Sequence, residues 1–307
     1  MIVAEVVRSG FVESVHHGAV VVLDRSGVVL AAAGDVVSPV LPRSSLKPLQ
    51  TVGMLRAGLV PREADDLALF SGSHYGEPFH VRRVRDVLAA AGLDESALRC
   101  PPAAPKAPAE LGPWHAAGGR AEPILHNCSG KHAGMLATCV AAGWPRETYR
   151  DPGHPLQAAI AAAVTELAGE LIADTAVDGC GAPVFALSLT GLARAFLGLV
   201  TAVPGSPAGR VAEAMRSRPE LVAGTGAEDT VLIGAVPGLI AKGGAEGVHA
   251  VAVPGVGAVA LKIADGAMRA RMPVLAAGLR RLGVTSPWPG EWVLGGGEPV
   301  GEVRSVW

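Results

Sequence analysis

Strand-like segments stand near both ends of this chain, and helix-like segments fill its middle. Near the start, GAVVVLDRSGVVLAAAGD (residues 18–35) has two β-branched apolar runs separated by a turn-forming Asp-Arg-Ser-Gly cluster. Late in the chain, VHAVAVPGVGAVALKIADG (residues 248–266) is typical of a second antiparallel hairpin, turning at Pro254 and Gly255. This order predicts an α+β fold: one antiparallel sheet formed from both chain ends, with a helical lobe inserted in sequence.

The middle of the chain is expected to be helical, with one proline-rich connector. The connector, residues 100–114, is predicted to be a surface loop, because proline removes a helical hydrogen-bond donor. We find no linker or repeat, so we expect a single domain over residues 1–307, and a glycine-rich tail is expected to follow the last helix. Apolar spacing favours helices at residues 44–57, 79–93, 132–142, 154–171, 185–200 and 273–283.

Charge and the chain start limit the class of protein. A formal net charge of −2 over 307 residues gives no electrostatic attraction to nucleic acid. The start, MIVAEVVRSGF, lacks the cationic segment and long apolar run of a signal peptide. No stretch approaches the ~20 apolar residues of a membrane span. We therefore expect a cytoplasmic protein that acts on a small molecule, with no nucleic-acid or membrane partner.

Ser44 and Lys47 stand three residues apart at a predicted helix start, so their side chains share one face. A neutral lysine can take the proton of serine, which is otherwise a poor nucleophile, although a capping serine and a surface lysine explain the same spacing. Context favours the first interpretation, because Ser73 and then Lys242, which precedes two glycines, follow in the chain. This order resembles penicillin-binding proteins and serine β-lactamases in outline, but their Ser-Asp-Asn element is missing.

The stretch HNCSGKHAGM, residues 126–135, places a thiol three residues before an amine. Such a pair can be a nucleophile with its base, a redox centre, half of a metal site or an accident of composition. Disulfide frameworks need more cysteines, and in a reducing compartment spare thiols are buried, catalytic or metal-bound. The four cysteines are Cys100, Cys128, Cys139 and Cys180.

Five separated motifs, in order over nearly the whole chain, resemble the asparaginase II family, the Rhizobium-type L-asparaginases. The motifs are RSSLKPLQ, SHYGEP, HNCSGKHAGM, DGCGAP and KGGAEGV. The resemblance implies a serine β-lactamase-like fold, which class A glutaminases share, and a homodimer. It also implies an L-asparaginase, which hydrolyses L-asparagine to L-aspartate and ammonia.

The same resemblance implies that two Ser-Lys pairs carry out the hydrolysis. Ser44 would attack the amide with Lys47 as its base, and Ser73 with Lys242 would pass a proton onwards or polarise the amide. A second lysine also helps to keep one of the two neutral, because two ammonium groups repel each other.

Other side chains in these motifs are candidates for binding the substrate. Arg43 can meet the α-carboxylate, and Asp178 the α-ammonium. His74 can bind substrate or transfer protons. His132 can do either through hydrogen bonds, although a histidine on a helix is more often structural.

The resemblance further implies one zinc ion per chain, held by Cys128, Lys131 and Cys180. Thiolates are good zinc ligands, but lysine is unusual because its amine must lose a proton to bind a metal. The alternatives are a Cys128–Cys180 disulfide, which a reducing compartment disfavours, and Cys128 as a nucleophile with Lys131 as its base. We expect the zinc to orient the substrate and to hold two loops together.

Two other functions stay open. A glutaminase or another Ser-Lys hydrolase of β-lactamase-like fold has the same outline, and asparagine differs from glutamine by one methylene, worth only ~1 to 3 kcal/mol. A non-enzymatic zinc-binding protein with inert serines is the alternative of a different class. Ammonia release from asparagine, compared with glutamine and a chromogenic β-lactam, separates these functions.

Overall fold

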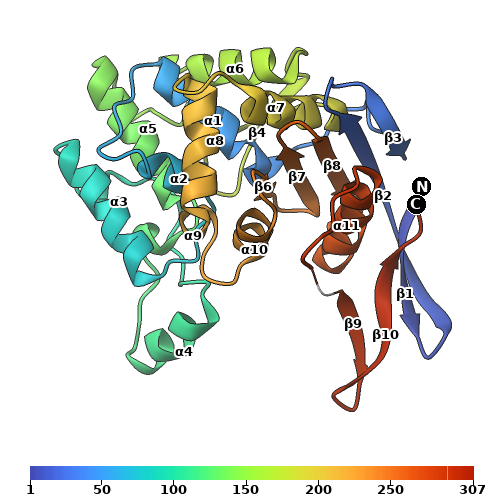
Figure 1. Cartoon of the computed structure of the whole chain (residues 1–307). Helices are drawn as coiled ribbons and strands as arrows, with labels where there is room; N and C mark the ends of the chain where they lie inside the picture. Colours follow the sequence, from blue (N-terminus) through green and yellow to red (C-terminus); the bar gives the residue numbers. More distant parts are fainter. Residues whose placement is uncertain (289) are drawn as a thin grey trace.

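The fold is described by a computed structural model that covers residues 1–288 and 290–307. Within these residues, an eight-stranded sheet has the order β6-β7-β8-β2-β1-β10-β9, with β3 also paired to β2 (Figure 1). Every pair of neighbouring strands is antiparallel. The strands are β1 (Ile2–Arg8), β2 (Phe11–Asp24), β3 (Val29–Ala33), β6 (Ile240–Gly243), β7 (Val248–Val253), β8 (Gly257–Ile263), β9 (Glu291–Gly295) and β10 (Glu298–Ser305).

This sheet joins the two ends of the chain. In the β1–β10 pair Ala4 stands opposite Ser305, and in the β2–β8 pair Val20 stands opposite Leu261. Figure 1 shows both termini together on the strand side of the molecule. The predicted α+β fold, with one antiparallel sheet from both chain ends and helices inserted between them, is confirmed.

Helices fill the middle of the described chain, and α11 lies between β8 and β9. A separate two-stranded sheet of β4 (Asp174–Val177) and β5 (Pro183–Ala186) lies among them. The α-helices are α1 (Lys47–Arg56), α2 (Asp66–Ser71), α3 (Pro78–Ala90), α4 (Pro108–Ala116), α5 (Ser129–Ala142), α6 (Pro155–Ala168), α7 (Leu189–Thr201), α8 (Pro207–Ser217), α9 (Pro219–Val222), α10 (Glu228–Ala235) and α11 (Arg271–Arg281). The 3₁₀ turns are η1 (Arg43–Leu46), η2 (Glu95–Ala97), η3 (Pro123–Leu125) and η4 (Met268–Ala270).

Local sequence signals set several of these helix ends. The Ser188 side chain caps α7 by accepting a hydrogen bond from the Gly191 amide. Helices α5 and α6 stop at Gly143 and Gly169, which adopt left-handed φ values of 68° and 66°. Glycine takes this conformation without a Cβ clash, so the two stops are specified by the residue type.

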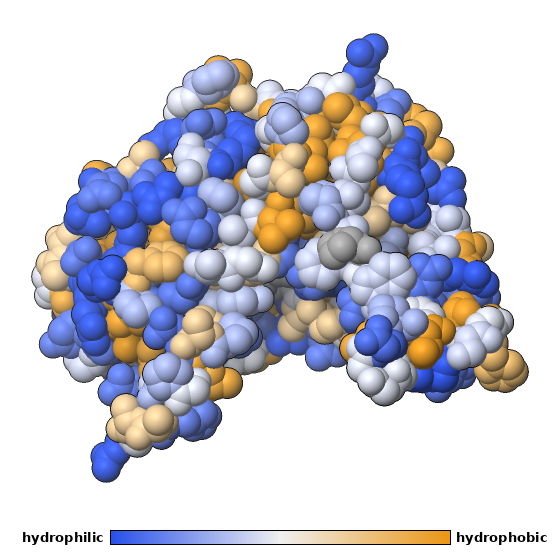
Figure 2. Space-filling model, turned by 60° about the horizontal axis from the view of Figure 1, so that its bottom comes forward, coloured by the Kyte–Doolittle hydropathy of each residue, from blue (hydrophilic) through white to orange (hydrophobic). Residues whose placement is uncertain are grey.

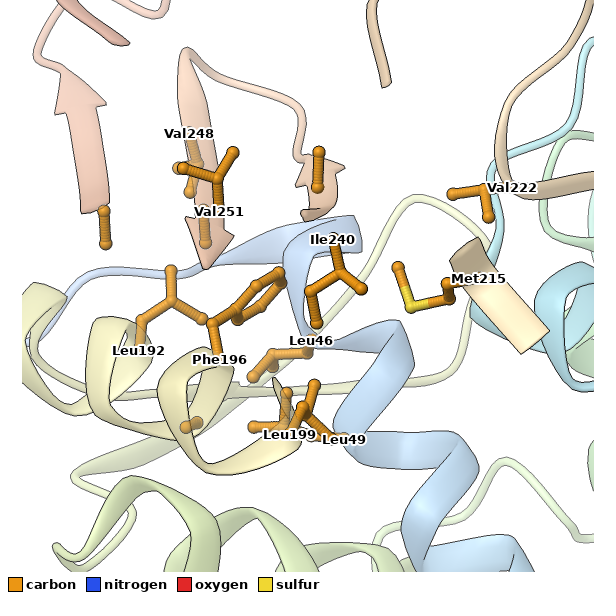
Figure 3. Packing of buried hydrophobic residues seen from close by; sticks show 14 of the residues in the cluster. Leu46, Leu49, Leu192, Phe196, Leu199, Met215, Val222, Ile240, Val248 and Val251 are labelled. Atoms are coloured by element: carbon orange, nitrogen blue, oxygen red, sulfur yellow. The ribbon is translucent and has the colours of Figure 1, made fainter. Parts of the chain in front are cut away.

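Helix α7 lies at the centre of the hydrophobic core. Its Leu192 and Phe196 lie close to Val248 and Val251 of β7 and to Leu46 of η1 (Figure 3). All five side chains are fully buried, and burying each one contributes about 1.5–3 kcal/mol. This packing fixes the η1 turn relative to the sheet.

Two segments differ from the expectation from sequence. The proline-rich connector is not a loop throughout, because it contains α4: Pro108 occupies the first turn, where a missing N–H costs little. Pro113 lies inside this helix, none of whose residues is buried. The glycine-rich tail forms β9 and β10, which turn at Gly296 and Gly297 and extend the sheet beyond β1.

The surface mixes residue types. On the face shown in Figure 2, hydrophobic residues form separate patches among hydrophilic ones. Over residues 1–288 and 290–307, no helix has the length and apolar character needed to cross a bilayer.

Candidate active site

A pocket of about 210 Å³ is formed by residues from both lobes. Three of the four expected catalytic residues line it: Ser44, Ser73 and Lys242. The fourth, Lys47, is completely buried and makes a hydrogen bond to the pocket-lining Ser73. The structure therefore gathers the expected catalytic residues around one cavity.

The η1 turn holds Ser44 at the pocket wall. Arg43 adopts φ 55°, a left-handed conformation that is uncommon for residues other than glycine. Ser45 Oγ donates a 2.8 Å hydrogen bond to the Lys242 carbonyl, which ties the turn to β6. Ser44 is thus held next to the strand that carries the second expected lysine.

Lys47 uses its amine to join α1 to two loops, residues 72–73 and residue 127. Its Nζ donates to the Gly72 carbonyl at 2.5 Å, to Ser73 Oγ at 2.9 Å and to the Asn127 carbonyl at 3.3 Å. A protonated amine has three N–H donors, so these contacts occupy all of them. Gly72 is needed here, because a Cβ at this position would lie 2.6 Å from the Leu221 carbonyl oxygen.

Burial lowers the pKa of Lys47 from 10.5 to about 8. Cys128 acts in the opposite direction, whereas the positive charges of Lys131 and Lys242 lower the pKa further. An amine with this pKa is neutral in a useful fraction of molecules near neutral pH. Lys47 is therefore able to accept a proton.

The side-chain pairs differ from those expected. Lys47 donates to Ser73 Oγ at 2.9 Å, and no hydrogen bond joins it to Ser44 among the described residues. Lys242 Nζ lies 3.2 Å from Asp229 Oδ2, and no hydrogen bond joins it to Ser73 among the described residues. Ser73 is thus the serine in direct contact with the lysine of lowered pKa.

Asp229, at the start of α10, is a pocket residue that sequence reasoning missed. Besides Lys242 it accepts hydrogen bonds from the Gly243 amide at 3.0 Å, and His249 Nε2 lies 2.9 Å from its Oδ1. Burial alone would raise the pKa of Asp229, but Lys242, His249 and the amide outweigh burial and lower it. The only signal in the sequence was an acidic residue in a first helical turn, which is common at helix starts.

Arg43 and Asp178, the expected substrate-binding pair, bind each other. Arg43 Nε donates to Asp178 Oδ1 at 2.7 Å, and neither residue lines the pocket. The ion pair links η1 to the turn between β4 and β5.

The two expected substrate histidines are completely buried and lie outside the pocket lining. His74 Nδ1 accepts a hydrogen bond from the Gly76 amide at 3.2 Å, and Nε2 lies 2.8 Å from Ser129 Oγ. His132 Nδ1 lies 2.5 Å from the Tyr149 hydroxyl. Burial lowers the pKa of both histidines, so both are neutral and hold the scaffold together.

Cys128, Lys131 and Cys180 come together, as expected. Lys131 Nζ donates to Cys180 Sγ at 3.2 Å, and both cysteines are buried and free, so the alternative disulfide is not formed. The neighbouring Cys128, Lys131 and His132 together lower the pKa of Cys180, against the effect of burial. The pKa of Cys180 is thus lowered, whereas that of Cys128 is raised.

The chemistry of this cluster fits zinc, with two sulfurs and an amine as donors. His132 Nε2 is buried beside Cys180 and has no hydrogen-bond partner in the described chain, so it can donate to a metal-bound thiolate. Over residues 1–288 and 290–307, no group of three or more His, Cys, Asp or Glu side chains is placed to hold a metal. Zinc binding here would thus require Lys131 as the third ligand.

Two serines on one pocket, next to a lysine that can accept a proton, are the arrangement of a hydrolase. Residues 4–305 match the family described as L-asparaginase II. The chain belongs to that family. No curated protein matches it.

Several solved structures are distantly similar. A β-lactamase from Mycobacterium bovis is 18% identical, with a TM-score of 0.43, and the match covers 86% of this chain and 94% of that one. Mglu in its native form is 15% identical over 89% of this chain and 66% of that one, with a TM-score of 0.47. A mutant of simvastatin synthase from Aspergillus terreus is 13% identical over 86% and 88%, with a TM-score of 0.39. The family assignment therefore rests on the sequence match.

Proposed function

We propose that the protein is an L-asparaginase, which hydrolyses L-asparagine to L-aspartate and ammonia with Ser44 as the nucleophile. One observation carries this proposal: Ser44 and Ser73 line a single pocket, and the buried Lys47, with a pKa of about 8, donates a hydrogen bond to Ser73. Membership of the L-asparaginase II family supports the carboxamide of asparagine as the bond that is cleaved.

In this mechanism Ser44 Oγ bonds to the carboxamide carbon while neutral Lys47 takes its proton, directly or through the Ser73 hydroxyl. Lys242 places a positive charge at the pocket, where it stabilises the developing oxyanion. The C–N bond then breaks, and ammonia leaves with the proton that Lys47 returns. Water attacks the resulting ester, again with Lys47 as base, and releases aspartate.

We also propose that one zinc ion binds Cys128, Lys131 and Cys180. When bound, it would orient the substrate and neutralise the thiolates. The residues themselves come from the start of α5 and from the β4–β5 turn, so they already hold these two segments together. We also propose a cytoplasmic location. The family resemblance implies a homodimer, and light scattering of the purified protein would test this by measuring its mass.

The direct test is ammonia release by purified protein from asparagine, with glutamine and a chromogenic β-lactam as controls. We expect asparagine to be hydrolysed with the highest kcat/KM, and Ser44→Ala to abolish turnover. Preference for glutamine or for the β-lactam would replace this proposal with another hydrolase. No turnover of any of them, with zinc bound, would favour the non-enzymatic alternative.

A further inference from the structure

Arg271, the first residue of α11, lines the same pocket as Ser44, with its side chain only 7% exposed. It forms an ion pair with Glu228, also in the lining, whose side chain is 28% exposed. Its Nη1 donates a long hydrogen bond of 3.3 Å to the Gly244 carbonyl. Its Nε is buried and has no partner within the described residues.

This guanidinium is held at a cost. Burying a charge costs several kcal/mol unless its partners are well placed, and a guanidinium has five N–H donors to satisfy. Burial lowers the pKa of Arg271 to about 10, which still leaves it charged at neutral pH. One carboxylate and one long backbone contact leave part of this donor set free for a ligand in the pocket.

The Arg271 guanidinium lies near Gly243 and Gly244, the strand end against which the η1 turn of Ser44 also packs. A Cβ at Gly243 would lie 2.7 Å from Arg271 Nη1, and a Cβ at Gly244 would lie 2.4 Å from the Pro42 carbonyl oxygen of the η1 entry. Real Cβ atoms do not approach other atoms so closely. Gly244 therefore allows η1 to pack directly against this strand end, and Arg271, whose flexible side chain ends at Gly243, lies against the same strand end.

We propose that Arg271 and Glu228 bind the α-carboxylate and the α-ammonium of an amino-acid substrate. This inference rests on the proposed function and adds the part of the pocket that recognises the amino-acid head group. A guanidinium matches a carboxylate through two parallel hydrogen bonds, and a zwitterion supplies one opposite charge to each member of the existing ion pair. Arg43 and Asp178 also form an ion pair, but they are less suited because neither residue lines the pocket.

Two truncated substrates test the assignment. β-Alaninamide is asparagine without the α-carboxylate, and succinamate is asparagine without the α-amino group. We expect Arg271→Gln to raise KM for asparagine roughly 100-fold, with a smaller change in kcat, and to abolish the preference for asparagine over β-alaninamide. Glu228→Gln is expected to abolish the preference over succinamate instead.

The matched control is Arg269→Gln, because Arg269 contacts His16 and Ser14 and does not line the pocket. It should leave both preferences unchanged. Arg43→Gln tests the rival assignment: if it, rather than Arg271→Gln, erases the preference over β-alaninamide, the inference is overturned. Persistence of both preferences in the Arg271 and Glu228 variants would also overturn it.

Separate control experiments distinguish a failure to fold, and a failure of the proposed function, from a failure of this inference. Circular dichroism reports the fold, and if Arg271→Gln does not fold, Arg271→Lys and Glu228→Gln decide by the same preferences. If the wild-type protein releases no ammonia from asparagine, the proposed function fails, and calorimetric binding of L-aspartate decides the inference. Weaker binding to Glu228→Gln than to wild type then supports it, and equal or absent binding overturns it.

Discussion

Lys47 and Lys131 are equally buried, at 0% and 1% exposure, yet their pKa values move in opposite directions. Lys47 donates to two carbonyls and a hydroxyl, so burial dominates and its pKa falls to about 8. Burial also acts to lower the pKa of Lys131, but the sulfurs of Cys180 and Cys128 outweigh it and raise the pKa. The charge of a buried lysine is thus set by its neighbours rather than by its depth.

The two lysines are nevertheless parts of one structure. Lys47 binds the carbonyl of Asn127, and the next residue, Cys128, belongs to the cluster of Lys131. The uncharged surroundings of Lys47 lower its pKa, as a proton-transferring lysine requires. The sulfurs around Lys131 raise its pKa, which is consistent with a structural role. Four experiments test whether this division of roles is correct.

The largest effect is expected at the nucleophile on the Lys47 side. Ser44→Ala should lower kcat by a factor on the order of 10,000 or more with an unchanged melting temperature, because the hydroxyl proposed to form the ester is lost. Ser73→Ala should cost about 100-fold, since Ser73 only relays or positions the proton. Assays of ammonia release measure both. If Ser73→Ala proved the more damaging of the two, the serines would have exchanged roles.

Replacing Lys47 or Lys131 by methionine tests directly whether the two lysines have different roles. Lys47→Met should reduce kcat by about 100- to 1,000-fold, because a general base is lost. Lys131→Met should affect kcat much less, since this lysine does not transfer the proton. The free energy of unfolding, measured with urea, controls for damage to the fold. Equal losses of kcat in both folded variants would contradict the proposed difference in role between Lys47 and Lys131.

The sulfur cluster is tested by its metal content. Protein purified without added metal should contain about one zinc per chain by elemental analysis. Cys128→Ser or Cys180→Ser should lose most of this zinc and weaken asparagine binding about 10-fold, because the two segments are no longer held. Stoichiometric zinc in both variants would place the metal elsewhere.

The last effect, also about 10-fold, is expected from pH. Because the pKa of Lys47 is lowered to about 8, its neutral form rises from about a tenth of the molecules at pH 7 to about nine tenths at pH 9. Activity should therefore rise about 10-fold over this interval, with an apparent pKa that belongs to the coupled lysines. A flat or falling profile in intact protein would count against Lys47 as the base.

Much of the fold could be predicted from the sequence, because its signals are local. The hairpin at residues 18–35 and the one at residues 248–266 follow from β-branched runs and turn residues, and both are present as β2–β3 and β7–β8. The helix α4 could not be predicted, because a proline in the first turn is compatible with both a loop and a helix. Strands β9 and β10 depend on pairing with β1, from the opposite end of the chain.

For the site, sequence motifs indicated which residues line the pocket but not the partner of each charged side chain. Ser44, Ser73 and Lys242 line one pocket, and their catalytic roles stay a prediction. The partner of Lys242 could not be predicted, because Asp229 lies on a helix whose sequence resembles any acidic helix start. Contacts between distant segments decide such pairs, and no local pattern records them.

The position of β2 in the sheet has a consequence for how the chain is made. One edge of β2 pairs with β8, whose residues 257–263 come late in the sequence. At about 5–20 residues per second, the ribosome needs on the order of 10 to 50 seconds to supply that partner after β2 has emerged. During this interval the nascent chain carries an open strand edge, which is a site for pairing with other chains. Faster translation, or a chaperone that covers this edge, should therefore raise the yield of folded protein.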